Sequence, residues 1–245
     1  ENWTTGAQAA FSGGVTTVFD MPNNNPSITN RDNLDLKQKI VDEQIDKIGL
    51  PLKKYLYFGA TAENIDEIKK VKDEVIGVKM FMAASTGNLL INKKEAQERI
   101  FKVCSELDKV LAVHAENDEM INNNINKYKK PEIWDHSKIR TPEAAVKEVG
   151  KALDMAIKHD TKLYICHVST KKEVELIKEK KQKSDKIYAE VTPHHLFLNQ
   201  SYYETLGTKA QMNPPLRTKE DNEALWQGVR DGVIDTIGTD HAPHT

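Results

Sequence analysis

The chain has 245 residues, which is enough for one large domain with a well-buried core or for two small ones. Its 35 basic and 37 acidic residues leave a formal net charge of −2, so no whole-chain attraction to nucleic acid or to an anionic membrane is expected. No run of residues is apolar and long enough to cross a membrane, and no signal peptide is visible, so we expect a cytoplasmic protein.

Strand-like apolar runs alternate with helix-forming segments along the whole chain. A helix near residues 4–13 is expected first, then a strand at 15–21, and, after a loop rich in Asn and Pro, a helix capped by Thr29 or Asn30 and running to about Lys47. The same cycle predicts further strands near 54–60, 75–82, 110–115, 162–168, 186–192 and 233–239, and helices near 63–73, 92–107, 142–159, 170–183 and 219–230. A long polar loop is expected after the strand that ends near residue 115, and a loop containing Asn213-Pro-Pro-Leu-Arg217 after the strand that ends near residue 192.

Seven strands separated by helices predict a parallel sheet with right-handed crossovers. An open doubly wound sheet and a (β/α)8 barrel that lacks one strand both fit this number. No Gly-x-Gly-x-x-Gly follows the first strand, which removes the main support for a dinucleotide fold. Residues able to bind metal lie at the C-terminal ends of several strands, which is typical of barrels. The pattern therefore favours one incomplete, TIM-like (β/α)8 barrel domain over residues 1–245, with about seven of its eight strands.

Four of the predicted strands carry, or end in, a side chain that can bind a metal ion: Lys79, His114, His167 and Asp240. At the open end of a barrel these side chains can converge on one point, as a metallohydrolase site requires. Taken alone, either histidine is more simply interpreted as a hydrogen-bonded core residue. Two histidines in equivalent positions on consecutive strands favour metal ligands.

Lys79 and Asp240 each allow two interpretations. Lys79 interrupts an apolar strand, where a buried ammonium group is costly; it either reaches past the strand end to water or is a neutral amine that has reacted with carbon dioxide. The resulting carbamate could bridge two metal ions. Asp240 precedes His-Ala-Pro-His244 and could cap a turn, or could bind metal and take a proton from a metal-bound water.

The two cysteines, Cys104 and Cys166, do not make a disulfide framework and are expected to be structural. Because Cys166 directly precedes His167 on a predicted strand, its side chain is expected to point to the opposite face.

These motifs resemble the ordered ligand set of the amidohydrolase superfamily: Gly-Val-Lys79-Met-Phe-Met, Val-His114-Ala-Glu-Asn, Cys-His167-Val-Ser-Thr and Gly-Thr-Asp240-His-Ala-Pro-His. Within the superfamily the chain is similar to the bacterial-type dihydroorotases. Three more motifs carry that narrower resemblance: Asp-Met-Pro-Asn23, Glu-Val-Thr-Pro-His-His195-Leu and Met-Asn213-Pro-Pro-Leu-Arg217. The resemblance runs from about residue 1 to the last residue.

The resemblance implies a site with two zinc ions and the reversible hydrolysis of dihydroorotate to N-carbamoyl-aspartate, a step of de novo pyrimidine biosynthesis. Carboxylated Lys79 would bridge the ions, His114 and His167 would bind one of them, and Asp240 would bind the other and transfer a proton to the leaving nitrogen. Three further residues would bind the substrate: Asn23 and His244 its carboxylate, and Asn213 its ring. The only partner implied is this small molecule, with no nucleic acid or membrane, and the resemblance allows a homodimer.

The chain departs from the family in one respect. The first barrel strand of the family carries His-x-His-x-Arg, which supplies two more metal ligands and a clamp for the substrate carboxylate, whereas this chain has no histidine before His114. It starts at Glu1 without an initiator Met and stops at His244-Thr245, so we expect a barrel domain truncated at both ends and inactive by itself. Two alternatives stay open: a different cyclic amidase, such as an allantoinase or a hydantoinase, and an inactive pseudo-dihydroorotase that scaffolds a partner.

Overall fold

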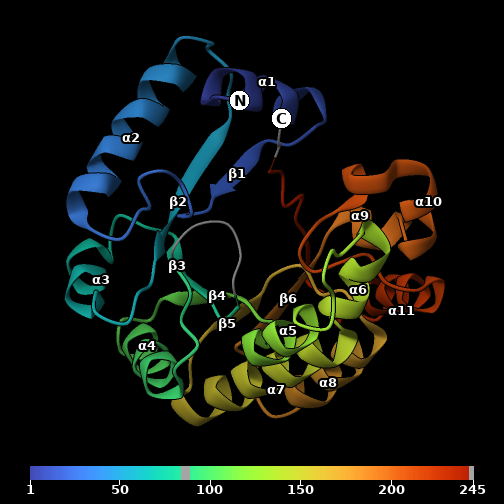
Figure 1. Cartoon of the computed structure of the whole chain (residues 1–245). Coiled ribbons are helices and arrows are strands. Elements are labelled where there is room, and N and C mark those ends of the chain that lie inside the picture. Colours follow the sequence, from blue (N-terminus) through green and yellow to red (C-terminus); the bar gives the residue numbers. More distant parts are fainter. Residues whose placement is uncertain (84–88, 243–245) are drawn as a thin grey trace.

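The computed structural model describes residues 1–83 and 89–242. Within these residues seven parallel strands form one sheet whose order in space is their order in the chain, β1 to β7. The strands are β1 Thr17–Asp20, β2 Lys53–Gly59, β3 Gly77–Phe81, β4 Val110–His114, β5 Leu163–Ile165, β6 Ile187–Val191 and β7 Thr236–Ile237. The sheet curls, and helices cover its outer side (Figure 1). The prediction of an incomplete (β/α)8 barrel is confirmed.

Seven helices form the outer layer and agree with the predicted helices to within a few residues: α1 Trp3–Ser12, α2 Arg31–Asp46, α3 Ile65–Val71, α4 Lys94–Glu106, α7 Pro142–His159, α8 Lys171–Lys181 and α11 Lys219–Arg230. Asn30, not Thr29, caps α2, since its side chain accepts a 2.9 Å hydrogen bond from the main-chain N–H of Asn33. In the described residues no helix combines the length and the apolar character needed to span a membrane.

The two segments predicted as loops after the strands that end near residues 115 and 192 contain short helices. The first holds α5 Asp118–Ile125, a 3₁₀ turn at Ile133–Asp135 and α6 His136–Ile139; the second holds α9 Pro193–Phe197, α10 Tyr203–Leu206 and 3₁₀ turns at Gln200–Tyr202 and Gly207–Ala210. Their polar sequences conceal these helices because only a few side chains in each are buried. Both segments lie at the C-terminal end of the sheet, where barrel enzymes place their sites.

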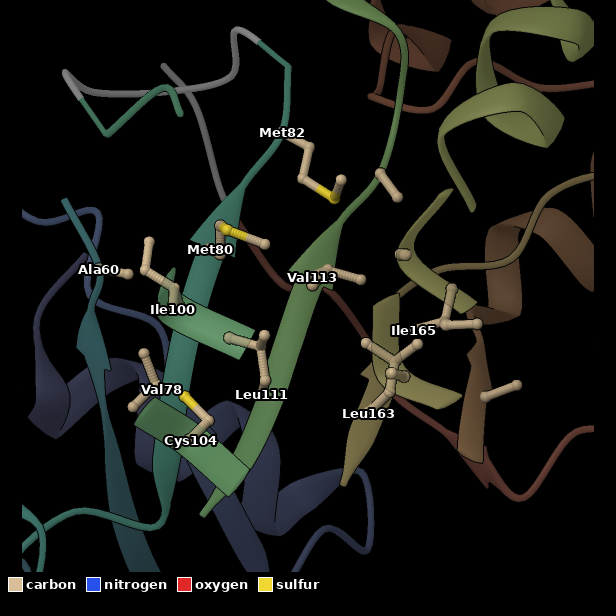
Figure 2. Close-up of a cluster of buried hydrophobic side chains, with 14 of the residues drawn as sticks. Ala60, Val78, Met80, Met82, Ile100, Cys104, Leu111, Val113, Leu163 and Ile165 are labelled. Atoms are coloured by element: carbon tan, nitrogen blue, oxygen red, sulfur yellow. The ribbon is translucent and has the colours of Figure 1, made fainter. Parts of the chain in front are cut away.

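The main core lies between the outer face of the sheet and the helices. Val78 and Met80 of β3 and Leu111 and Val113 of β4 are fully buried there, beside Ile100 of α4 (Figure 2). Fully burying one such side chain stabilises the fold by roughly 1.5–3 kcal/mol. These residues alternate along the strands with side chains that face inward.

The inner face of the sheet is smaller and more polar. Tyr57, Ala112 and Cys166 form a separate buried cluster there. Lys79 is the register partner of Ala112, so it faces inward as well. Lys79 of β3 and His114 of β4, two residues after Ala112, therefore lie on the inner face, as does Cys166 just after β5.

The two edges of the sheet are open. Within the described residues β1 pairs only with β2, and β7 only with β6. Phe19 of β1 stacks on Tyr55 of β2 at 5.4 Å between ring centroids but stays 49% exposed, and Ile237 of β7 is 57% exposed. The curl brings Glu1 close to the segment after β7, where Nε2 of His241 lies 2.8 Å from a carboxylate oxygen of Glu1.

Two strands end earlier than predicted. We expected strands at 162–168 and 233–239, but β5 ends at Ile165 and β7 spans only Thr236–Ile237. His167 and Asp240 adopt left-handed backbone conformations, with φ of 41° and 46°. An extended strand cannot continue through such a residue, so the chain turns at both sites.

Candidate metal centre

His114 and His167 face each other at the C-terminal end of the sheet. His114 is the last residue of β4 and His167 follows β5; they are 2% and 6% exposed. Nδ1 of His114 lies 3.0 Å from Nε2 of His167. Two nitrogens bound to one tetrahedral zinc ion at 2.0–2.1 Å lie about 3.3 Å apart. The pair therefore fits the bidentate chelation of one zinc ion with only a small adjustment.

Burial determines the protonation state of the two imidazoles. It lowers the pKa of His114 below the usual value and that of His167 well below it, and the positive charge of Lys79 adds to both effects. Both rings are therefore neutral at pH 7, which is the form of histidine that binds zinc.

Lys79 is buried beside this pair. It is 3% exposed, its Nζ donates a hydrogen bond to Sγ of Cys166 at 2.9 Å, and the same Nζ lies 5.1 Å from the ring centroid of Phe81. The residue does not reach past the strand end to water. A lysine amine in this position is close enough to both histidines for its charge to affect their pKa values.

The prediction that Cys166 and His167 point to opposite faces is wrong. Strand alternation holds only to Ile165, and the left-handed residue His167 turns the chain so that both side chains reach the site. Burial raises the pKa of the Cys166 thiol to about 12, and Lys79 offsets this only in part. The thiol is therefore protonated at neutral pH.

Glu116 and Arg140 form a buried ion pair next to His114. Oε2 of Glu116 lies 2.9 Å from Nε2 of His114 and accepts a 3.0 Å hydrogen bond from Nε of Arg140. Burial alone would raise the pKa of Glu116, but the hydrogen bond from His114 and the charge of Arg140 outweigh it and hold the pKa well below the usual range. Sequence reasoning missed both residues: Glu116 lies within a quoted motif, whereas Arg140 gives no local signal.

Glu190 of β6 holds the main chain at the second histidine. One of its carboxylate oxygens accepts from the N–H of His167 at 3.1 Å, and the other accepts from the hydroxyl of Tyr164 at 2.7 Å. Burial raises the pKa of Glu190. Glu190 begins the quoted motif Glu-Val-Thr-Pro-His-His195-Leu, but a single acid in an apolar strand gives no sequence signal for this contact.

Asp240 lies at the open edge of the site. It follows β7 and is exposed to solvent, although its charge still acts on Cys166 and Glu190. Across residues 1–83 and 89–242, no group of three or more His, Cys, Asp or Glu side chains has the geometry to hold a metal ion. The structure thus buries Lys79, His114 and His167 together, whereas Asp240 is exposed and forms no metal-binding group with the two histidines.

The predicted substrate-binding residues lie in loops. Asn23 follows β1 and is partly buried. Asn213 is also partly buried, and among the described residues its Oδ1 has no hydrogen-bond partner although it is shielded from solvent. His244 lies outside the described residues.

Two histidines without a role in the sequence interpretation hold the main chain on either side of Asn213. Nε2 of His136 donates to the carbonyl of Met212 at 2.9 Å, and Nε2 of His195 donates to the carbonyl of Pro214 at 3.1 Å. Burial lowers the pKa of His195 to about 3, so this ring is a neutral donor. The carbonyls on both sides of Asn213 are thereby fixed while its side-chain oxygen has no such contact.

The sequence model of the amidohydrolase family matches residues 1–245. The chain belongs to the amidohydrolase family. Two amidohydrolase relatives illustrate the similarity. A dihydroorotase of Methanosarcina acetivorans is 34% identical, with 100% of this chain and 53% of the relative covered. A dihydroorotase of a Thermoanaerobacter species is 36% identical, with 98% and 54% covered. The chain spans about half the length of the curated relatives that it matches.

A solved amidohydrolase structure supports the same assignment. L-Hydantoinase (dihydropyrimidinase) from Arthrobacter aurescens superimposes with a TM-score of 0.92 at 27% identity, covering 99% of this chain and 54% of that one. The resemblance inferred from the strand-end motifs is therefore confirmed at the level of the family and the fold.

Proposed function

We propose that the protein containing this chain is a zinc-dependent dihydroorotase, which hydrolyses dihydroorotate reversibly to N-carbamoyl-aspartate in pyrimidine biosynthesis. The observation that carries the proposal is the buried, facing pair of His114 and His167 beside Lys79. It occurs in an amidohydrolase chain whose relatives, at 34% and 36% identity over nearly its full length, are named dihydroorotase.

In this proposal His114 and His167 would hold one zinc ion, Asp240 would hold a second, and carboxylated Lys79 would be a ligand of both. Bound zinc polarises a ring carbonyl and lowers the pKa of water. The chain supplies the proton transfer: the carboxylate of Asp240 accepts a proton as water adds to the ring amide and passes it to the leaving nitrogen.

Residues in the loops would orient the substrate. Asn23 and His244 would hold the carboxylate of dihydroorotate, and Asn213 would bind its ring. The fixed carbonyls of Met212 and Pro214 support this assignment, because they hold the main chain of Asn213 in place before the substrate arrives. An oxygen shielded from solvent and without a protein partner suits a ligand N–H.

The whole activity also needs the residues that the relatives carry outside the matched half. Two further metal ligands and an arginine for the substrate carboxylate would come from there. The enzyme would be cytoplasmic, with the small-molecule substrate as its partner; the family resemblance also allows a homodimer.

The test is an assay of the whole protein, loaded with zinc, on dihydroorotate, hydantoin and allantoin. We expect dihydroorotate to be turned over fastest and the His114→Ala variant to be inactive. No turnover of dihydroorotate by protein with zinc bound would contradict the proposal.

A hydantoinase is the second candidate, favoured by the fit to L-hydantoinase with a TM-score of 0.92. A hydantoin carries no carboxylate, so Asn23 and His244 would have no anionic group to bind. Faster turnover of hydantoin or allantoin would establish this alternative. A protein without stoichiometric zinc would instead support the inactive scaffold.

A further inference from the structure

We propose that Glu116, fixed by Arg140, is a positioning residue that orients the His114 ring so that Nδ1 and not Nε2 faces the metal ion. The inference rests on the proposed metal centre. It does not depend on which cyclic amide is hydrolysed.

The first step is the location of the proton on His114. A carboxylate only accepts hydrogen bonds, so the 2.9 Å contact between Glu116 and Nε2 of His114 requires a hydrogen on Nε2. Nη2 of Arg140 also lies 3.4 Å from Nε2 of His114, and a hydrogen bond between these two nitrogens would need a lone pair on Nε2. We assign the hydrogen to Nε2 because its contact with the charged carboxylate of Glu116 is shorter and stronger. The lone pair of the neutral ring is then on Nδ1, which faces His167.

The second step is that Arg140 leaves Glu116 little freedom. Nε and Nη2 of Arg140 both donate to Oε2 of Glu116, the same atom that accepts from His114. The main-chain carbonyl of Arg140 accepts in turn from Nη1 of Arg217. Glu116 is 0% exposed and Arg140 is 7% exposed, so water does not compete for these contacts.

The third step is the contrast with His167, which the structure holds through its main chain. Glu190 accepts from the N–H of His167, and the left-handed turn directs the ring. The ring of His114 is instead oriented by its side-chain contact with Glu116.

The experiment is a zinc titration of the full 245-residue chain against a chromophoric chelator. Glu116→Met removes the acceptor at nearly constant size, and the double variant with Arg140→Met also removes the buried cation. Replacing both charges restores stability that the single change loses. We expect zinc affinity to fall about 10- to 100-fold in both variants, because loss of such a partner loosens the ligand.

A matched control is Glu148→Met, since Glu148 is 3% exposed and accepts from Asn117 and Lys151 but belongs to α7 and does not contact His114. We expect its zinc affinity to stay within about twofold of the parent. The inference is overturned if the double variant binds zinc as tightly as the parent, or if the parent binds no more tightly than His114→Ala. Absence of dihydroorotate turnover in the whole protein would leave these zinc results unaffected and would count against the proposed function alone.

Discussion

The functional side chains in the middle of the sheet are buried together, whereas the one beyond its last strand is exposed. In β3, β4 and the turn after β5, Lys79, His114 and His167 are all at most 6% exposed and lie together. At the edge, Asp240 is exposed and follows a strand of two residues. A strand with neighbours on both sides is fixed in register by two ladders, whereas an edge strand has one. Assembly of the site therefore follows strand pairing.

The largest loss of unfolding free energy is expected in the middle of the sheet, when the cation of the buried Glu116–Arg140 ion pair is removed. Arg140→Met leaves the Glu116 carboxylate buried without its cation, and we expect a loss of about 3–5 kcal/mol in unfolding free energy. Urea denaturation measures this. The companion change Lys151→Met removes a half-exposed partner of Glu148 and should cost less than about 1 kcal/mol. Equal losses in the two variants would argue against the contrast between an ion pair with a buried cation and one with a half-exposed cation.

An apolar truncation compares the two regions directly. Leu111→Ala in β4 empties a fully buried position and should destabilise the chain by about 2–5 kcal/mol. Ile237→Ala in β7, where the side chain is 57% exposed, should stay within about 0.5 kcal/mol. Thermal unfolding of both variants provides the comparison, and a large loss at Ile237 would mean that the edge is covered in solution.

The buried, neutral ring of His195 should make the unfolding free energy depend on pH. Its pKa is about 3 in the folded chain and near 6.5 when unfolded, so its contribution is complete above the unfolded pKa and is lost as pH falls toward 3. This group alone gives a slope of at most about 1.4 kcal/mol per pH unit. His195→Gln should flatten the curve of unfolding free energy between these pH values. An unchanged slope would show that His195 is not buried as a neutral ring.

The smallest effect is expected at the edge. Asp240→Asn should change the zinc affinity of this chain by less than about threefold, because the Asp240 carboxylate is exposed, screened by solvent, and in no metal-binding group with the two histidines. In the whole protein, where we propose that Asp240 binds metal, the same substitution should abolish turnover. A large change in the zinc affinity of this chain would show that Asp240 binds the same zinc ion as His114 and His167.

The sequence predicted seven strands, the outer helices and the family, because strand-period apolar runs and strand-end motifs are local signals. Glu116 and Arg140 escaped prediction as a pair because their contact joins residues 24 positions apart through α6, a helix concealed in a polar segment. The side of Cys166 was predicted wrongly, because alternation assumes a strand that continues, and His167 adopts a left-handed turn that strand propensity does not reveal.

The most direct test of the account is the crystal structure of this chain soaked with zinc, with the metal located by anomalous scattering. We expect one site between β4 and β5, bound by Nδ1 of His114 and Nε2 of His167 at about 2.0–2.1 Å, with Glu116 still in contact with Nε2 of His114. Zinc bound elsewhere, or bound through Nε2 of His114, would contradict it.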